Sequence, residues 1–326
     1  MPAVFIAAIL LTVLLPIWVI IIGLYDLIRA PRRMPHLRLV AFAFCWAWIE
    51  VASLLVAFYL WASGQIKKPA PLNSLQRRWA ARLVGALRIT CGLKLRVIGN
   101  ELIRPGPVVV LARHASLADS VVSFFLVAPT AATIPRYVLK RELLSDPALD
   151  VGGNRGDNHF LDRTATDAAP ELAALSALSA GMGTDGVSVI FPEGTRANPK
   201  KTARALEKIG GHDPERAQRL RNLKHLLPPR PAGSYALVSG APTADIVILG
   251  HVGFEGLDTF SGILKGIPND DPIYAWMRRI PRGEVPVDEA GFTLWLDNTW
   301  LQLDREIDTE LQARAGAFVE SRSTKS

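Results

Sequence analysis

The chain of 326 residues has only two cysteines, Cys45 and Cys91, which excludes a scaffold held together by disulfides. The six histidines are scattered, and none forms a His-Glu-x-x-His motif, so the sequence predicts no metal site. Charged residues make up 21% of the chain and hydrophobic residues 49%, which excludes an intrinsically disordered protein. These proportions are typical of a folded protein with one or two domains.

Charge is nearly absent from residues 1–65, which contain two acids and four basic residues. Residues 3–24 carry no charge, and residues 39–62 carry one, Glu50. Each run exceeds the roughly 20 residues that a helix needs to cross a bilayer. We therefore predict a hydrophobic membrane anchor of two helices over residues 1–65, with a kink at Pro16 in the first. Glu50 is expected to face the other helix or the edge of the bilayer.

A cleaved signal peptide is the alternative for the first run, but it fits poorly. No basic residue precedes the run, and no small-residue cleavage site follows it. Basic residues flank the second run on both sides, so the positive-inside rule favours a re-entrant or interfacial anchor over a simple span. We expect the protein in the inner membrane of a bacterium, with its catalytic domain on the cytoplasmic side.

Acids are also absent from residues 66–96, where eight lysines and arginines occur. Within this segment the apolar side chains that repeat every four residues, and so share one side of a helix, are Leu75, Trp79, Leu83 and Leu87. We predict a basic amphipathic segment at the membrane interface. An equally good interpretation is a helix that packs this side on the domain core and leaves its arginines in water.

The composition changes in residues 97–326, where β-rich runs alternate with helix-like stretches. Candidate strands are 108–112, 135–139, 187–191 and 245–250, and candidate helices are 117–126, 168–180, 213–226 and 292–317. This alternation predicts an α/β domain, a mixed sheet flanked by helices. The polar stretches 152–158 and 200–204 are predicted to be loops.

The segment VVVLARHASLADS, residues 108–120, carries the first candidate site. An apolar strand ends just before His114, and Asp119 follows five residues later, too far round one straight helix for the two side chains to meet. They meet if His114 lies in the turn after the strand and Asp119 in the first turn of the next helix. The carboxylate then orients the imidazole, whose other nitrogen serves as a base. The nucleophile would be a hydroxyl of the substrate.

The segment VSVIFPEGTRAN, residues 187–198, carries the second candidate site. A buried strand runs into Pro and Gly and so turns sharply at its carboxyl end, which is where α/β sheets bind ligands. Glu193, Thr195 and Arg196 are expected to project there, and arginine is suited to phosphate recognition.

The blocks HASLAD and FPEGTR, in this order, resemble signature blocks of the glycerolipid acyltransferases, most closely the 1-acyl-sn-glycerol-3-phosphate acyltransferases. VLKREL and FLDRTATD, at 138–143 and 160–167, resemble a further block that ends in an arginine, here Arg163. LKHLLPPRPAG at 223–233 is similar to a block of the branch that includes lysocardiolipin-type enzymes. The resemblance covers residues 75–310.

The resemblance implies transfer of a fatty acyl group from a thioester to the hydroxyl of a lysophospholipid. His114 would be the general base and Asp119 its orienting partner. The residues implied for binding the acceptor are Arg163, Glu193, Gly194, Thr195 and Arg196, with the two arginines on its phosphate. We expect no cofactor, acyl-CoA or an acyl-carrier protein as donor, and membrane lipids as partners. Backbone amides after His114 are the candidates for stabilising the oxyanion.

The sequence leaves the acceptor open. The first choice is 1-acylglycerol-3-phosphate, and lysocardiolipin or lysophosphatidylinositol are alternatives. A relative without activity that binds lipid, or a membrane-anchored protein that binds nucleic acid through its net charge of +7, is a weaker interpretation, and we expect no nucleic-acid partner. Arg113 stands where the first block usually has asparagine, and an unscreened cation there would lower the pKa of His114.

Overall fold

The computed structural model describes residues 2–116, 119–128, 133–161, 167–257, 259–269 and 271–323. Its centre is a mixed sheet with the strand order β1-β7-β6-β2-β5-β3-β4. Only the β6–β7 pair is antiparallel among these described strands. The strands are β1 (Leu95–Ile98), β2 (Val108–Ala112), β3 (Ile134–Lys140), β4 (His159–Leu161), β5 (Gly186–Ile190), β6 (Asp245–Val252) and β7 (Ile273–Ile280). The predicted fold class is confirmed.

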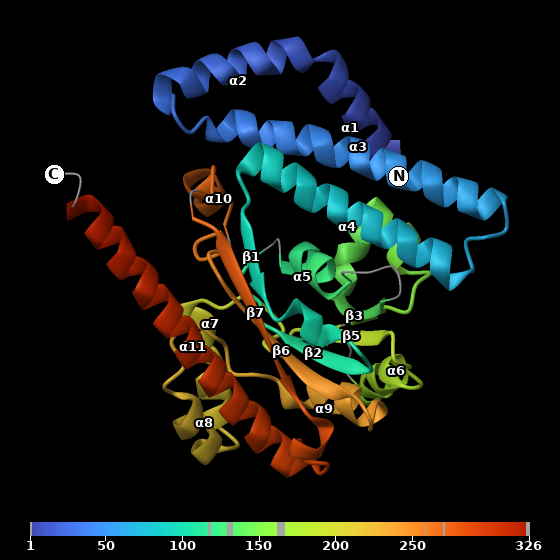
Figure 1. Ribbon diagram of the computed structural model, residues 1–326, viewed down its shortest axis with the longest axis vertical. Helices are drawn as coiled ribbons and strands as arrows, with labels where there is room; N and C mark the ends of the chain where they lie inside the picture. Colours follow the sequence, from blue (N-terminus) through green and yellow to red (C-terminus); the bar gives the residue numbers. More distant parts are fainter. Residues whose placement is uncertain are drawn as a thin grey trace.

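Helices cover both faces of the sheet (Figure 1). They are α4 (Pro69–Cys91), α5 (Asp119–Val127), α6 (Ala169–Ser179), α7 (Pro199–Gly210), α8 (Pro214–Leu220), α9 (Pro231–Gly240), α10 (Phe260–Gly266) and α11 (Glu289–Ser323). Short helical turns lie at Asn100–Ile103, Arg141–Ser145, Leu149–Gly153 and Arg282–Glu284.

The central strands are buried on both faces because their side chains alternate between two apolar clusters. Val109 and Leu111 of β2 pack in one cluster with side chains of α6, α9 and α11. Val108 and Val110 pack in the other with side chains of α4 and α5. The carboxyl ends of β2 and β5 lie side by side, because these two strands pair in parallel.

The apolar N-terminal region forms three helices, α1 (Pro2–Val13), α2 (Leu15–Arg29) and α3 (Pro35–Ala62). The first run bends by 71° between α1 and α2, next to Pro16, as predicted. By length and composition α3 is long enough to cross a membrane, and α1 with α2 qualifies only if the bent pair counts as one span. Figure 1 shows these helices together at one end of the molecule, with α4 between them and the sheet.

Glu50 ties α3 to the rest of the chain. Its side chain is fully buried and accepts hydrogen bonds from Trp79 Nε1 of α4 at 2.6 Å and from the backbone N–H of Ala148 at 2.9 Å. The expectation that Glu50 faces the other anchor helix or the bilayer edge was wrong. It faces α4 because the indole and amide donors that a buried carboxyl group needs lie there.

The apolar side of α4 is covered by protein. Leu75, Trp79 and Leu83 are buried, whereas Arg78 and Arg82 on the other side are exposed. The apolar side therefore packs on the core, as in the alternative interpretation, and the position of residues 66–96 at a membrane interface stays a prediction.

Two predicted elements differ in type or extent. Residues 200–204 belong to α7 rather than to a loop, because Asn198 caps the helix by accepting from Lys201 N and Pro199 suits its first turn. The helix predicted over 213–226 ends at Leu220. It stops because Asp304 of α11 accepts from the backbone N–H groups of 224–226, which then make no helical bonds. Strands β1, β4 and β7 were not predicted.

Candidate active site

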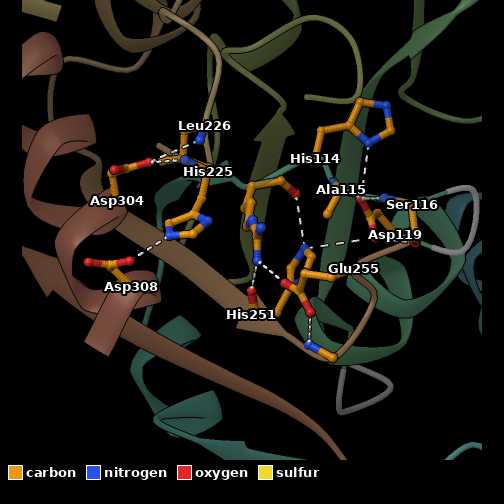
Figure 2. A network of polar contacts seen from close by, with 12 residues as sticks. His114, Ala115, Ser116, Asp119, His225, Leu226, His251, Glu255, Asp304 and Asp308 are labelled. Carbon is orange, nitrogen blue, oxygen red and sulfur yellow. Dashed lines mark hydrogen bonds and ion pairs between the residues drawn. The ribbon is translucent and has the colours of Figure 1, made fainter. Parts of the chain in front are cut away.

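His114 and Asp119 meet at the carboxyl end of β2. His114 lies in the turn after the strand, and Asp119 is the first residue of α5. His114 Nδ1 lies 3.0 Å from Asp119 Oδ2, which is the geometry predicted for the pair (Figure 2). The ring of His114 also packs against Phe191, with a centroid distance of 4.9 Å. The contact with Asp119 occupies Nδ1 and leaves Nε2 for a substrate.

The buried carboxylate of Asp119 accepts hydrogen bonds from several donors. Besides the imidazole of His114, it accepts hydrogen bonds from the backbone N–H groups of Ala115 and Ser116 and from the Ser116 hydroxyl. Burial penalises its negative charge, but the imidazoles of His251 and His114 and the Ser116 hydroxyl offset this, so the pKa of Asp119 lies below its usual range. Asp119 is therefore an ionised partner that holds the Nδ1 proton of His114.

Among the described backbone amides after β2, those of residues 114–116 are already used and do not stabilise the oxyanion, whereas residues 117 and 118 lie outside the described part of the chain. Ala115 N and Ser116 N donate to Asp119, and His114 N donates to Glu193 Oε1 at 2.8 Å. Carboxyl oxygens of Asp119 and Glu193 accept these donors before any substrate arrives, so the donors are not free for a developing oxyanion.

Glu193 lies behind His114 rather than in a cavity. It is 1% exposed, and its second oxygen accepts from Leu227 N at 2.9 Å. The carboxyl group thus joins the turn after β2 to the LKHLLPPRPAG segment. The predicted direct contact with the acceptor is therefore replaced by a structural role, since both oxygens face backbone N–H groups. Burial raises the pKa of Glu193 to about 8, against the opposing effect of those two hydrogen bonds.

Glu193→Ala is expected to lower the free energy of unfolding by about 2 kcal/mol at pH 5, because the buried backbone N–H groups of His114 and Leu227 lose their acceptors. The folded state keeps a proton that the unfolded state releases above its ordinary pKa of 4.5, so this stabilisation falls as the pH rises from 4.5 to 8. The deficit should therefore shrink between pH 5 and pH 8 in denaturant titrations of the detergent-solubilised chain. A deficit that does not change with pH would contradict this assignment.

The FPEGTR turn brings Gly194 and Arg196 to a cavity and leaves Thr195 beside it. Gly194 has a φ of +70°, in the left-handed region that favours glycine, and a Cβ there would lie 3.3 Å from Arg230 Nε. Lys201 Nζ donates to the Thr195 hydroxyl and to the Arg196 carbonyl, which holds the turn against α7. Arg163, predicted to bind the acceptor phosphate, lies outside the described residues.

Two cavities meet beside His114. The first has a volume of about 410 Å³ and is lined almost wholly by apolar side chains, among them Phe42 of α3, Leu83 of α4 and Phe124 of α5. The second has a volume of about 360 Å³ and is lined by His114 itself. The residues that line both are Ser116, Leu139 and Leu143. The apolar cavity therefore adjoins, through these shared residues, the cavity that His114 lines.

Three cationic side chains line the second cavity, and sequence reasoning had identified only Arg196 among them. Lys140 comes from the end of β3 and Arg230 from the start of α9. Arg230 N donates to Pro192 O at 2.8 Å, so the two turns that carry the arginines are locked together. The carboxylate in the lining, Glu171, pairs with His159 at 2.6 Å. The cavity therefore suits an anion.

The segment that carries Arg230 is held by the C-terminal helix. Asp304 binds three successive backbone N–H groups, and Asp308 pairs with His225 (Figure 2). Arg216 is buried between Asp297 and the carbonyl of Pro229. The resemblance of LKHLLPPRPAG to a family block had indicated the segment, but its placement beside FPEGTR is what brings Arg230 to the cavity. In the part of the chain that the structure describes, no group of three His, Cys, Asp or Glu residues is arranged to hold a metal.

Comparison with known proteins agrees with these features. Residues 94–222 match the family model described as Acyltransferase. The chain is 28% identical over 225 residues to the 1-acyl-sn-glycerol-3-phosphate acyltransferase epsilon of Mus musculus, covering 66% of this chain and 60% of that protein. It is 22% identical over 233 residues to lysophosphatidylinositol acyltransferase 10 of Caenorhabditis elegans, covering 68% and 57%. The chain thus spans less than two thirds of the length of each relative.

A solved structure is also similar, the 1-acyl-sn-glycerophosphate (LPA) acyltransferase PlsC from Thermotoga maritima. The TM-score is 0.47 at 15% identity, over 81% of this chain and 98% of that one. The family model and the two relatives confirm the resemblance that the HASLAD and FPEGTR blocks predicted. Over residues 94–222 the chain is therefore similar to the acyltransferase family.

Proposed function

We propose that this chain is an O-acyltransferase that moves a fatty acyl group from a thioester to the free hydroxyl of a lysophospholipid, preferably 1-acylglycerol-3-phosphate. The observation that carries the proposal is the meeting of an apolar cavity and a cationic cavity beside His114. A fatty acyl chain is stabilised in an apolar cavity, and a phosphate group is stabilised in a cationic one. The ester bond forms where they meet.

In this mechanism His114 is the general base. Its Nε2 takes the proton of the acceptor hydroxyl while the oxygen attacks the thioester carbonyl. The C–O bond forms, the C–S bond breaks, and the imidazolium returns the proton to the departing thiolate. Asp119 keeps Nδ1 protonated throughout and stabilises the imidazolium. Because the thioester is already activated, the step needs neither an acyl-enzyme nor a cofactor, with acyl-CoA or an acyl-carrier protein as donor.

The first cavity is assigned to the fatty acyl chain. Its walls come from α3 and α4 as well as from the sheet, so the chain would lie between the N-terminal helices and the catalytic core. The second cavity is assigned to the acceptor headgroup, with Lys140, Arg196 and Arg230 around the phosphate. A phosphate held there places the neighbouring hydroxyl at the base, and this positioning contributes much of the rate enhancement.

Membrane attachment is part of the proposal. Many large apolar side chains on α1–α3 are exposed, including Ile9 at 56%, Ile21 at 63% and Phe58 at 63%. Soluble monomers rarely leave so many apolar groups together in water. We place α1–α3 in lipid and, from the basic flanks of α3, the catalytic domain at the cytoplasmic face of a bacterial inner membrane. The lysophospholipid then reaches His114 from the membrane.

A second acceptor class has support from the nematode relative, whose name specifies lysophosphatidylinositol. A phosphodiester carries one negative charge, whereas a phosphomonoester carries nearly two at neutral pH. Three cations around one cavity favour the monoester. Acyl transfer by the detergent-solubilised chain to both acceptors, to lysocardiolipin and to an uncharged monoacylglycerol decides between these possibilities, with acyl-CoA and acyl-carrier-protein donors in parallel.

Arg196→Ala and Arg230→Ala are each expected to raise the KM for 1-acylglycerol-3-phosphate by about tenfold to a hundredfold, the effect of losing one charge-assisted hydrogen bond. The KM for the acyl donor should change little. Arg221→Ala, which removes an exposed arginine that does not line the cavity, is the matched control. Equal rises in both KM values would argue against a role on the acceptor phosphate.

A further inference from the structure

A second buried histidine lies on the far side of Asp119. His251 is near the end of β6, which pairs in parallel with β2 so that Ala112 is level with Leu249. This register brings His251 level with the turn that carries His114. Its Nε2 lies 3.8 Å from Asp119 Oδ1 and 3.3 Å from the Arg113 carbonyl oxygen, and the residue is 6% exposed. Figure 2 shows Asp119 between the two imidazoles.

The surroundings of His251 determine which ring nitrogen carries its proton. Nε2 faces two oxygen acceptors, whereas the buried Nδ1 has no hydrogen-bond partner among the described residues. The proton therefore lies on Nε2, because a protonated Nδ1 would be a buried donor without an acceptor. Burial lowers the pKa of His251, despite the opposing effect of Asp119, so the ring is neutral at neutral pH. Its Nε2–H donates to the Arg113 carbonyl oxygen, and the neutral ring lies beside the carboxylate of Asp119.

The unusual Arg113 belongs to the same assembly. It is 3% exposed, and its guanidinium donates to the backbone carbonyl of His251 and to Glu255 Oε1, the latter at 2.9 Å. Glu255 also accepts from Gly253 N at 2.6 Å. The charged groups that face His251 are thus Asp119, Arg113 and Glu255, and the ring of Phe254 packs edge-on against it. Glu255 screens the cation that the sequence had placed beside the base.

We infer that His251 is a positioning residue for the acyl transfer proposed above, acting through Asp119 and held in place by the Arg113–Glu255 ion pair. Its Nε2–H donates to the Arg113 carbonyl oxygen, which fixes the turn before His114, and the positive end of this N–H dipole lies 3.8 Å from Oδ1 of Asp119, which also accepts from the Ser116 hydroxyl. The carboxylate is then a weaker partner for the imidazolium of His114 than it would be alone. His251 and the ion pair therefore set the pH range in which His114 is a free base.

The test is the pKa of the His114 imidazole in the full-length chain in detergent micelles, followed by ¹⁵N NMR and assigned with His114→Ala. His251→Phe removes the Nε2–H dipole, so Asp119 should pair more strongly with the imidazolium and the measured pKa of His114 should be higher than in the wild type. The acid limb of kcat/KM should move to higher pH with it. His251→Gln, whose amide can place a donor near the former Nε2, should restore most of both values.

Glu255→Gln provides a second and opposite change. It leaves Arg113 without a counter-charge, so the pKa of His114 should fall rather than rise. His212→Gln, at an exposed position, is the control and should move neither value. A His114 pKa that is unchanged in both His251→Phe and Glu255→Gln would overturn the inference, as would equal shifts in His251→Phe and His251→Gln. Because the NMR titration needs no substrate, it stands even if the wild-type chain transfers no acyl group, which would contradict only the proposed function.

Discussion

Replacing His114 with alanine is expected to lower kcat/KM for acyl transfer by about 10³-fold, because general-base catalysis contributes two to four orders of magnitude. The imidazole lines the headgroup cavity and has its Nδ1 occupied by Asp119, so no other side chain presents a free basic nitrogen at the same point among the described lining residues. The KM for the donor should change little, since the loss falls on the transition state. The measurement is steady-state transfer with saturating acceptor.

The fold should survive His114→Ala because the ring makes one ion-pair contact and one aromatic contact, both at the edge of a cavity. A thermal melt within a few degrees of wild type would show that the loss is chemical. His212→Ala removes an exposed imidazole and is the matched control, expected to retain full activity. Near-normal transfer by a folded His114→Ala protein would exclude the dyad as the catalytic centre.

Asp119→Asn is expected to cost about 10³-fold to 10⁴-fold in kcat, by analogy with triads in which the acid is converted to an amide. The asparagine NH₂ would donate to Nδ1 of His114 and push the ring proton onto Nε2, the nitrogen that must accept the substrate proton. The imidazole would remain in place but in the wrong tautomer. Measurements of kcat and of the acceptor KM should show a fall in the first and little change in the second.

The same substitution should also lower stability by about 1–3 kcal/mol, because donors from Ala115 and Ser116 would then compete for one amide oxygen. Activity therefore has to be compared at a temperature where both proteins are folded. Asp157→Asn, which alters a side chain that is 62% exposed, provides the control for loss of a carboxylate. Full activity of a folded Asp119→Asn protein would mean that Asp119 orients the backbone only.

Several parts of the fold follow from local sequence. Strands β2, β5 and β6 are short apolar runs that end at turn residues, and a strand buried on both faces has this pattern wherever it lies in the sheet. The apolar N-terminal helices could be predicted because a stretch of 65 residues with few charges is typical of helices that contact a membrane. The meeting of His114 with Asp119 depends on one turn and one helix start, both within six residues, and is therefore also local.

Other elements have no comparable local signal. In β7 buried residues such as Ala275 and Met277 alternate with half-buried Arg278 and Arg279, and the strand forms because β6 and β1 flank it. The residues that follow α8 leave the helix because Asp304, about 80 positions away in the chain, binds their N–H groups. Neither effect can be read from a window of ten residues.

By itself the sequence determined the class of chemistry, through a base and an acid at a strand end and an arginine turn after another strand. The tertiary structure decided what each polar group does. It buried Glu193 behind the site, assigned the amides after β2 to Asp119, and brought Lys140, Arg230 and His251 to the same imidazole. The reason is physical: side-chain spacing along one element is local, whereas hydrogen-bond partners in a buried site depend on strand order and on which groups exclude water.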